Sequence, residues 1–419
     1  MTEYIKSKDL TLLIRDAFKL IDKRLMDHGT KTAYIFCKML ECMDKYEKFE
    51  IADFSILATL HDIGAYKTDN LNDMLRFEAK DYLPHSIYGY LFLKCLSPFD
   101  DMSKIILYHN SDYSKIKNFD YEYIEEASCL NLAEKVAIYH TALRERFNPA
   151  MFNQYVGTKY SETTLALFSE AMKKYDIIGH LNSDEYLKDM DDIIDYVIFS
   201  DEEKNKYLQM LMYCTGFRSE NSVVDTVTTI CVCKEIANYM GCSKSDKELL
   251  YYGALVHDIG MLAIPYSIIE ATRKLTPEEY ARMQKHVEIE EEMFKGRLLP
   301  EVIKIAVAHH ERGDGTGYPK KLKESQMNIL QGILQVGDTV TGLVNKRSYR
   351  VPHSKESVIS ILKEESGKRR YRKDVVDVFV TYYDEIMGIV SKESEEILAV
   401  HRKIKLQYEQ VYKALNKNR

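Results

Sequence analysis

The sequence predicts an all-α protein, and three observations lead to that prediction. The 419-residue chain has 18 glycines and 8 prolines, about 6 % together, which is half the usual share of roughly 12 %. Apolar residues recur every three or four positions along most of the chain. No stretch alternates convincingly between apolar and polar residues, and no hairpin turn signal is present. Long helices are therefore expected, rather than a sandwich or a propeller.

Taken in order, the expected helices cover both ends of the chain. Helical spacing marks residues 10–21, 35–43 and 397–415. Two shorter apolar helices, 56–60 and 252–256, each end in a His-Asp pair. The charged stretch 184–206 lacks Gly and Pro, so we expect a helical connector there. The last stretch has one apolar stripe, which either packs on its own domain or mediates a homodimer; it comprises Ile397, Val400, Ile404, Val411 and Leu415.

Composition excludes several classes of protein. A net charge of −7 argues against binding DNA or RNA polymers, because affinity for the phosphate backbone comes from excess Lys and Arg. The eight cysteines are scattered through apolar stretches, as is typical of reduced cytosolic thiols. The N-terminus lacks the apolar core of a signal peptide, and no run approaches the ~18 apolar residues of a membrane span. We expect a soluble cytoplasmic protein with no membrane partner.

Histidine placement reveals an internal repeat. The tetrapeptide His-Asp-Ile-Gly occurs at His61–Gly64 and again at His257–Gly260. Other potential ligands flank the two copies in the same order. Those of the first copy are His28, His85, His109 and Glu134, and those of the second are Asp225, His286, His309, His310 and Asp338. A duplicated domain is the best explanation of this doubled series.

These residue types suit a metal centre. An Asp carboxylate has two oxygens and can bridge two ions, whereas each imidazole binds one. Two ions roughly 3.5–4 Å apart can hold a bridging hydroxide and polarise a phosphoryl group, which leads to phosphoester hydrolysis. Any single histidine of the series would be better explained as a hydrogen-bonded core residue, but the whole series would not.

The second copy contains one further motif. His309-His310-Glu311-Arg312 is followed by a Gly-rich loop that ends in Tyr318-Pro319. Paired histidines beside backbone N–H groups and an aromatic ring suit a nucleotide whose phosphates lie on metal ions and whose base stacks on the ring. The spacing matches neither a Walker motif nor a dinucleotide fingerprint.

With these motifs, residues from about 205 to 385 resemble an HD-GYP domain, the metal-dependent phosphodiesterase branch of the HD superfamily. The matching pieces are His257–Gly260, His286, the stretch His309–Pro319, Asp338 and the segment Arg347–Arg350. Residues 1–150 resemble a plain HD domain without the Gly-Tyr-Pro loop. The domains expected are thus an HD domain (1–150), a helical connector (151–204), an HD-GYP domain (205–390) and a C-terminal helix (391–419).

The resemblance implies roles for individual residues. His257, Asp258 and Asp338 would hold one divalent transition metal, Fe, Mn or similar. Asp258, His286, His309 and His310 would hold a second, with Asp258 bridging and His257 and Asp258 central to catalysis. The resemblance implies that the substrate would contact Gly315, Thr316, Gly317, Tyr318, Pro319, Arg347 and Arg350. The set His28, His61, Asp62, His85, His109 and Glu134 is a candidate metal site of the first copy.

Three positions depart from the pattern of the family. Asp225 stands where the family has its first histidine, Asn221 where a glutamate is often found, and Met261 where a lysine usually follows. Asp225 is expected either to replace an imidazole as ligand or to cap its helix. The basic run 368–373 is expected to be a solvated face, with a contact to product or partner as the alternative.

The resemblance implies an enzyme that linearises a cyclic dinucleotide, cyclic di-GMP or 3',3'-cyclic GMP-AMP. Two alternatives stay open. One is a catalytically weakened signalling protein that binds the cyclic dinucleotide without cutting it, and the other is an HD-type mononucleotide phosphohydrolase.

Overall fold

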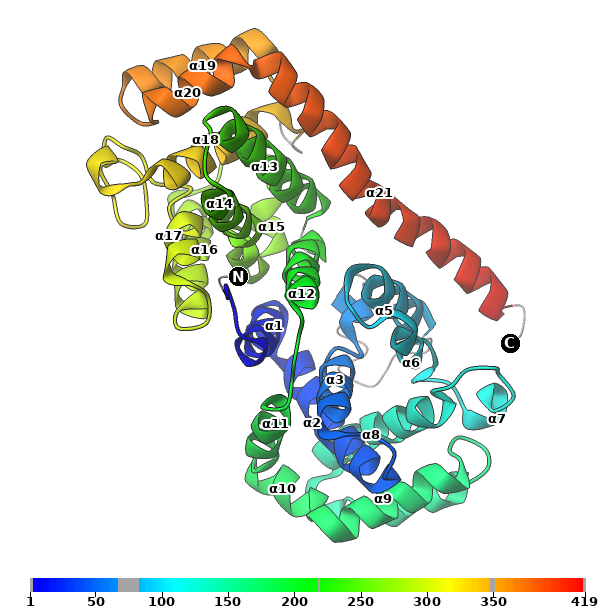
Figure 1. The fold of residues 1–419 in the computed structure, drawn as a ribbon. Coiled ribbons are helices and arrows are strands. Elements are labelled where there is room, and N and C mark those ends of the chain that lie inside the picture. Colours follow the sequence, from blue (N-terminus) through cyan, green and yellow to red (C-terminus); the bar gives the residue numbers. More distant parts are fainter. Residues whose placement is uncertain (1–2, 67–82, 218, 347–350, 417–419) are drawn as a thin grey trace. The chain divides into compact units, whose positions relative to one another are not determined.

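The computed structural model describes residues 3–66, 83–217, 219–346 and 351–416. The described parts of the chain are helical throughout (Figure 1), and the strand-like pairings they contain are isolated bridges, such as the one between Ile5 and Leu298. The all-α prediction is confirmed. No helix among the described residues is both long and apolar enough to cross a bilayer.

The chain divides into two compact units. Unit 1 comprises residues 1–20 and 207–402, and unit 2 comprises residues 21–206 and 403–419. The first twenty residues thus belong with the second half of the chain, although the sequence placed them in the first domain. Side-chain contacts explain this: the guanidinium of Arg297 pairs with Asp16 at 2.7 Å, and the Tyr4 hydroxyl donates to Glu248 at 2.8 Å. The expected connector, 151–204, lies within unit 2.

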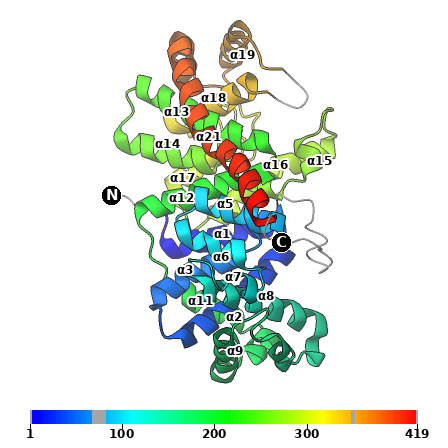
Figure 2. The same ribbon diagram turned by 90° about the vertical axis from the view of Figure 1, so that its right-hand side faces the viewer.

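Unit 2 is built around α2, which packs against α3, α8 and α9 (Figure 2). Aromatic residues fill this core, including Tyr34, Phe36 and Phe54. Its α-helices are α2 (Lys23–Met43), α3 (Lys48–Thr59), α5 (Leu83–Leu96), α6 (Lys104–Tyr108), α7 (Tyr113–Ile116), α8 (Ile124–Leu143), α9 (Glu162–Tyr175), α10 (Ile177–Ser183) and α11 (Tyr186–Ile194). Its 3₁₀ helices are η1 (Ile63–Tyr66), η2 (Asp100–Ser103), η3 (Arg144–Arg146) and η4 (Pro149–Tyr155), and α12 (Asp201–Cys214) runs across the division between the units.

Unit 1 is built around α13, which packs between α14 and α18. Its α-helices are α1 (Ser7–Ile21), α13 (Glu220–Tyr239), α14 (Lys244–Val256), α15 (Tyr266–Ile269), α16 (Pro277–Phe294), α17 (Pro300–Ala306), α18 (Ile329–Val344), α19 (Lys355–Gly367) and α20 (Lys373–Thr381). Its 3₁₀ helices are η5 (Thr215–Phe217), η6 (Ile259–Ala263) and η7 (Glu324–Gln326). Helix α21 (Tyr383–Asn416) begins in unit 1 and ends in residues assigned to unit 2.

The duplication is visible in the order of the elements. The series α2, α3, η1, α5, α6, α8 in unit 2 matches α13, α14, η6, α16, α17, α18 in unit 1. Equivalent residues have the same register. His28 lies five residues after the start of α2, and Asp225 lies five residues after the start of α13. The two units therefore share one order of helices, as the predicted duplication requires.

A glycine in each unit allows two elements to approach closely. A Cβ atom on Gly64 would lie 2.0 Å from the carbonyl oxygen of His85, and one on Gly260 would lie 2.2 Å from that of His286. Real Cβ atoms do not come so close to a backbone oxygen, so only glycine fits at either position. Each His-Asp turn is thereby pressed against the helix that bears the next histidine of the series.

The capping of helices fixes where the site residues lie. Helix α16 begins with a capping box in which the Thr276 hydroxyl accepts from the N–H of Glu279 at 3.2 Å and the Glu279 carboxylate accepts from the N–H of Thr276 at 2.9 Å. Asn328 and Gln331 form the same arrangement at the start of α18. Each box satisfies N–H groups that would otherwise lack a partner. The helices that bear His286 and Asp338 therefore begin at defined residues.

The apolar stripe of the C-terminal helix is partly covered by the chain itself. Ile404 is buried, Val400 and Val411 are half-buried, and Leu406 is exposed. The side chain of Ile397 lies outside the described residues, and both alternatives for the stripe, packing within the chain and a homodimer contact, stay predictions.

Candidate metal centre

Five helical elements of unit 1 bring the predicted residues of the second copy together. His257 and Asp258 follow the last residue of α14, His286 lies on α16, His309 and His310 follow α17, Asp338 lies on α18 and Asp225 on α13. With Glu290, also on α16, they form what we call the C-terminal cluster: Asp225, His257, Asp258, His286, Glu290, His309, His310 and Asp338.

Three imidazoles of this cluster are oriented by their own helices. The Nδ1–H groups of His257, His286 and His309 donate to the carbonyl oxygens three residues earlier, at 2.8, 2.7 and 2.6 Å. A carbonyl oxygen can only accept, so Nδ1 bears the proton and Nε2 is left as a lone-pair donor. Such a second hydrogen bond fixes the tautomer of metal-binding histidines.

These Nε2 atoms surround the Asp258 carboxylate on two sides. Oδ2 lies 3.4 Å from Nε2 of His257, whereas Oδ1 lies 3.7 Å from Nε2 of His286 and 3.9 Å from Nε2 of His309. The two oxygens of one carboxylate thus face different imidazoles. That is the arrangement in which an aspartate bridges two cations.

The contact between the His286 and His309 imidazoles favours a bound cation. Their Nε2 atoms lie 3.1 Å apart, and both Nδ1 atoms have donated their protons to carbonyls. Two lone pairs therefore face each other in the neutral forms. Two nitrogens that bind one ion at roughly 2.1 Å in tetrahedral or octahedral geometry lie about 3 Å apart. The donor set fits a divalent ion between them.

His310 completes the cluster from another direction. Its Nδ1 lies 3.7 Å from Oδ2 of Asp338, and its ring lies against the ring of Tyr318, with centroids 4.8 Å apart. Together with His286 and His309, His310 offers three ring nitrogens within 4.8 Å of one another.

Electrostatics keep these histidines in the form that binds metal. Burial lowers the pKa values of His286, His309 and His310, and the neighbouring imidazoles lower those of His309 and His310 further. Neutral imidazole is the ligand form. Burial also raises the pKa of Glu290, and the adjacent Asp258 charge raises it further.

A cavity of about 390 Å³ opens onto the cluster. Cluster residues line it together with polar and aromatic side chains from the surrounding helices. Arg312 is the one Lys or Arg among the described residues that line it, and its guanidinium lies 4.9 Å from the centre of the Tyr371 ring. Sequence reasoning missed Glu290, Arg312 and Tyr280 as site residues, although Glu290 stands one helical turn after His286, on the same face of α16.

The Gly-rich loop is positioned by its own hydrogen bonds. The buried Glu311 carboxylate accepts from the N–H groups of Lys320 and Leu322, at 2.6 and 2.8 Å. Of the predicted contact residues in the loop, Tyr318 lines the cavity. Gly315, Thr316, Gly317 and Pro319 do not. They form the turn: Gly315 has a φ of +82°, and a Cβ on Gly317 would lie 2.3 Å from the Arg312 nitrogen. Arg347 and Arg350 lie outside the described residues.

The basic run 368–373 is solvated in part, as expected, because Lys368, Arg369 and Lys373 are exposed. Arg370 pairs with Asp314 at 3.0 Å and with Glu365 at 2.7 Å, and its carbonyl accepts from the N–H of Gly313. Tyr371 is buried and shares a hydrogen bond with Thr339 at 2.7 Å. The middle of the run therefore braces the loop. A side chain at position 313 would also collide with Arg369, whose carbonyl oxygen would lie 2.6 Å from a Cβ there, which explains the glycine.

The first copy forms a second cluster in unit 2. Asp62 lies among four imidazoles: its Oδ2 faces Nε2 of His61 at 3.2 Å and of His28 at 3.9 Å, and its Oδ1 faces His85 at 3.5 Å and His109 at 3.8 Å. Nε2 of His109 also lies 3.9 Å from Oε2 of Glu134. We call these six residues the N-terminal cluster. Among the described atoms, Nε2 of His61, Oδ1 of Asp62 and Oε2 of Glu134 are buried without a hydrogen-bond partner. Such atoms are costly unless a partner binds.

One of the positions at which the two clusters differ is the residue that follows His109 and His309. His310 follows His309, whereas Asn110 follows His109. The Asn110 amide nitrogen donates to Nε2 of His109 at 2.7 Å and lies 3.2 Å from Nε2 of His85. Lys135 fixes the orientation of this amide by donating to its oxygen at 2.9 Å. In the first copy, the Asn110 amide thus lies between the imidazole lone pairs of His85 and His109. In the second copy, the equivalent lone pairs of His286 and His309 face each other directly.

The titration behaviour of this cluster follows from burial and charge. Burial lowers the pKa values of His28 and His85 to about 4. Burial would also lower the pKa of His61, but the charges of Asp62 and Glu134 outweigh it and raise that pKa. Burial raises the pKa of Asp62, whereas the surrounding imidazoles lower it. The lowering is the larger effect, so this pKa lies well below its usual value.

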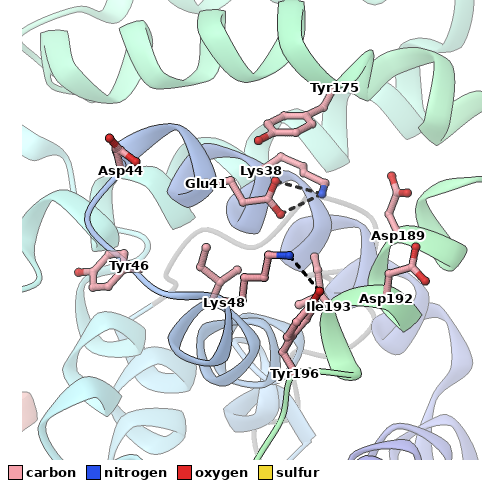
Figure 3. A pocket seen from close by; sticks show the side chains of 11 residues that line it. Lys38, Glu41, Asp44, Tyr46, Lys48, Tyr175, Asp189, Asp192, Ile193 and Tyr196 are labelled. Atoms are coloured by element: carbon pink, nitrogen blue, oxygen red, sulfur yellow. Dashed lines mark hydrogen bonds and ion pairs between the residues drawn. The ribbon is translucent and has the colours of Figure 1, made fainter.

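Unit 2 has a further cavity, of about 440 Å³, among residues of α2, α3 and α11 and the end of α9. Figure 3 shows that both of its lysines have partners among the lining residues: Lys38 contacts Glu41 at 2.9 Å, and Lys48 donates to the Tyr196 hydroxyl at 2.9 Å. Lys38 also lies over the Tyr175 ring at 4.8 Å. None of the cluster residues lines this cavity.

Comparison with known proteins agrees with this geometry. Residues 212–375 match the family model of the HD domain. A 3'3'-cGAMP-specific phosphodiesterase from Vibrio cholerae is 34 % identical over 160 residues, 38 % of this chain and 30 % of that protein. A cyclic di-GMP phosphodiesterase from Thermotoga maritima is 34 % identical over 164 residues, 38 % of this chain and 44 % of the relative. The chain thus spans less than half the length of these two relatives.

One comparison and one structure extend over nearly the whole chain. A second 3'3'-cGAMP-specific phosphodiesterase from Vibrio cholerae is 24 % identical over 399 residues, 88 % of this chain and 91 % of the relative. The crystal structure of a cyclic GMP-AMP-specific phosphodiesterase from the same organism covers 91 % of this chain and 98 % of its own, with a TM-score of 0.56 and 13 % identity. That structure shares the fold.

Proposed function

We propose that this chain is a metal-dependent phosphodiesterase of the HD-GYP branch of the HD superfamily, which opens a cyclic dinucleotide, cyclic di-GMP or 3',3'-cyclic GMP-AMP, to a linear product. The family model of the HD domain matches residues 212–375, the segment that contains the C-terminal cluster, and relatives named for these two substrates are 34 % identical over 160 and 164 residues. In the reaction one water oxygen bonds to phosphorus as one ribose oxygen leaves, so each ring that is opened consumes one water.

The proposal rests on one observation: imidazole nitrogens face both oxygens of the Asp258 carboxylate. His257 faces one oxygen, and His286 and His309 face the other. We infer that Asp258 would contribute to two sites for divalent ions, Fe, Mn or similar. His257, Asp338 and Asp225 would hold one ion, and His286, His309 and His310 would hold the other. Ions in these places supply a Lewis acid and an activated water at neutral pH.

The chain's own residues handle the substrate around this centre. Arg312 places a guanidinium in the cavity and suits a phosphate, because its fork of N–H groups matches phosphate oxygens. The family usually has a lysine at the position that Met261 occupies here. Arg312 would supply the positive charge that this lysine supplies in the family. Tyr318 offers a ring face beside His310 on which a base can stack.

The experiment is a comparison of metal content and turnover. The wild-type protein and the double variant His257→Ala/Asp258→Ala are loaded with Mn and offered a panel of cyclic dinucleotides and mononucleotides, with products resolved by chromatography. We expect the variant to lose the metal of unit 1 and the turnover of cyclic dinucleotides. Unchanged metal content by elemental analysis would contradict the assignment. Binding of a cyclic dinucleotide by wild type without turnover would instead indicate a signalling protein.

The N-terminal cluster supports a second candidate function, hydrolysis of a mononucleotide in unit 2. Its unpartnered atoms belong to His61, Asp62 and Glu134, and Asn110 occupies the place of a second ion. We propose that this cluster holds one ion and the C-terminal cluster two. Turnover of a mononucleotide that survives His257→Ala/Asp258→Ala would support this second activity.

A further inference from the structure

We propose that Glu290 is an additional carboxylate ligand of the metal centre in unit 1, a ligand that the first copy of the domain lacks. The inference rests on the metal centre of the proposed function. It concerns a residue to which neither the sequence motifs nor the comparisons assign a role.

The internal repeat shows that a carboxylate has replaced a glycine at this position. Gly89 stands four residues after His85, and Glu290 stands four residues after His286. A Cβ on Gly64 would lie 2.7 Å from the nitrogen of Gly89, and one on Gly260 would lie 2.9 Å from Cγ of Glu290. Gly89 and Glu290 therefore occupy the same place beside the His-Asp turn of their units.

The Glu290 side chain is fully buried and points at the cluster. Its Oε1 accepts from the N–H of Gly260 at 3.0 Å. Its Oε2 has no hydrogen-bond partner among the described residues. One of its oxygens lies within 4.8 Å of a carboxylate oxygen of Asp258 and a ring nitrogen of His286. An unpaired carboxylate oxygen in a buried site is costly, and a cation removes that cost.

Charge balance gives a reason for the extra carboxylate. With Asp225 in place of an imidazole, the C-terminal cluster contains four carboxylates: Asp225, Asp258, Glu290 and Asp338. Their combined charge equals in magnitude that of two divalent cations. Such an oxygen-rich set favours harder ions such as Mn over softer ones.

The alternative is that Glu290 only secures the turn that contains Gly260. Glu290→Gln separates the two roles, because the amide oxygen still accepts from the N–H of Gly260 but binds a metal ion far more weakly than a carboxylate does. Glu290→Gly reproduces the first copy. Glu288→Gln is the matched control, since Glu288 is exposed on the same helix.

The test uses the full chain in a His61→Ala/Asp62→Ala background, so that only the centre in unit 1 binds metal. Metal is removed by chelation, and Mn(II) binding is followed by calorimetry, with thermal unfolding of the metal-free protein measured in parallel. We expect Glu290→Gln and Glu290→Gly to weaken Mn binding about tenfold to a hundredfold, the range found when groups supporting a metal site are lost. Glu288→Gln should bind as the background does, and Glu290→Gln should unfold at the background temperature.

Two outcomes would overturn the inference. If Glu290→Gln binds Mn as tightly as the background, Glu290 only secures the turn, while the metal centre and the proposed function stand. If the background protein binds no Mn and wild type does not turn over cyclic dinucleotides, the centre itself fails, and the inference fails with it.

Discussion

Asp225 is the residue at which the proposed metal site of unit 1 has a carboxylate where that of unit 2 has the imidazole of His28, although both lie at the same register of equivalent helices. It lies five residues into α13, at the register of His28 in α2. The N-cap of α13 is Ser219, so the alternative that Asp225 caps the helix is wrong. Its Oδ1 accepts from the side-chain amide of Asn345 at 2.8 Å, and it lines the same cavity as Asp258.

We expect Asp225→Asn to weaken Mn binding and turnover, because the amide is the poorer ligand. We expect Asp225→His, which restores the imidazole of the family, to retain metal and to shift preference toward softer ions, because imidazole suits Zn, Cu, Fe and Ni while oxygen ligands suit Mn and Mg. Competition between Mn(II) and Zn(II), read by elemental analysis, checks this shift. Wild-type metal content and turnover in Asp225→Asn would mean that Asp225 is not a ligand.

At the scale of elements, helix α3 contains a half-buried carboxylate, Asp53, whose charge we expect to weaken the fold at neutral pH. Burial, together with the charges of Glu203 and Glu50, raises the pKa of Asp53 to about 6. Between the unfolded value of about 3.9 and 6, the folded state binds more protons than the unfolded state. The free energy of unfolding therefore falls as pH rises through this window.

Asp53→Asn removes this charge. We expect the variant to unfold a few degrees higher than wild type at pH 7.5, since about 1 kcal/mol shifts Tm by roughly 2–4 °C in domains of this size. At pH 4.5, only slightly above the unfolded pKa, the difference should be much smaller, roughly a third as large. Thermal unfolding at both pH values checks the prediction, with the exposed Asp120→Asn as control. An equal shift at both pH values would mean that the carboxylate's charge is not the cause.

Elements also show what the sequence could and could not predict. Helical spacing and the doubled His-Asp-Ile-Gly pattern led to the all-α fold, and the same pattern led to the residues that the structure brings together around Asp62 and Asp258. Glu290 was not foreseen, because a glutamate among Glu288, Glu291 and Glu292 reads as part of an exposed helix face. The role of Arg370 depends on Asp314, 56 residues earlier, a tertiary pairing that composition cannot reveal.

At the scale of the whole molecule, the two copies of the domain predict a division of labour. Only the second copy has Tyr318 and Arg312 beside its cluster, and only the first has an amide between two of its histidines. We expect His61→Ala/Asp62→Ala to keep a large part of the turnover of cyclic dinucleotides, and His309→Ala/His310→Ala to lose nearly all of it. Initial rates with Mn, alongside circular dichroism to establish folding, check this. The reverse result would assign catalysis to unit 2.

The paired glycines, Gly64 and Gly260, have a consequence for how the chain could evolve. Any substitution there would push a helix away from the His-Asp turn, because the backbone oxygen of His85 or His286 already occupies the space of a side chain. Both positions are therefore expected to remain glycine. The copies differ instead at other positions around the same turn, among them Gly89 and Glu290, or Asn110 and His310. If the two clusters have the roles proposed above, a few substitutions of this kind would give one duplicated domain two chemistries within a single polypeptide.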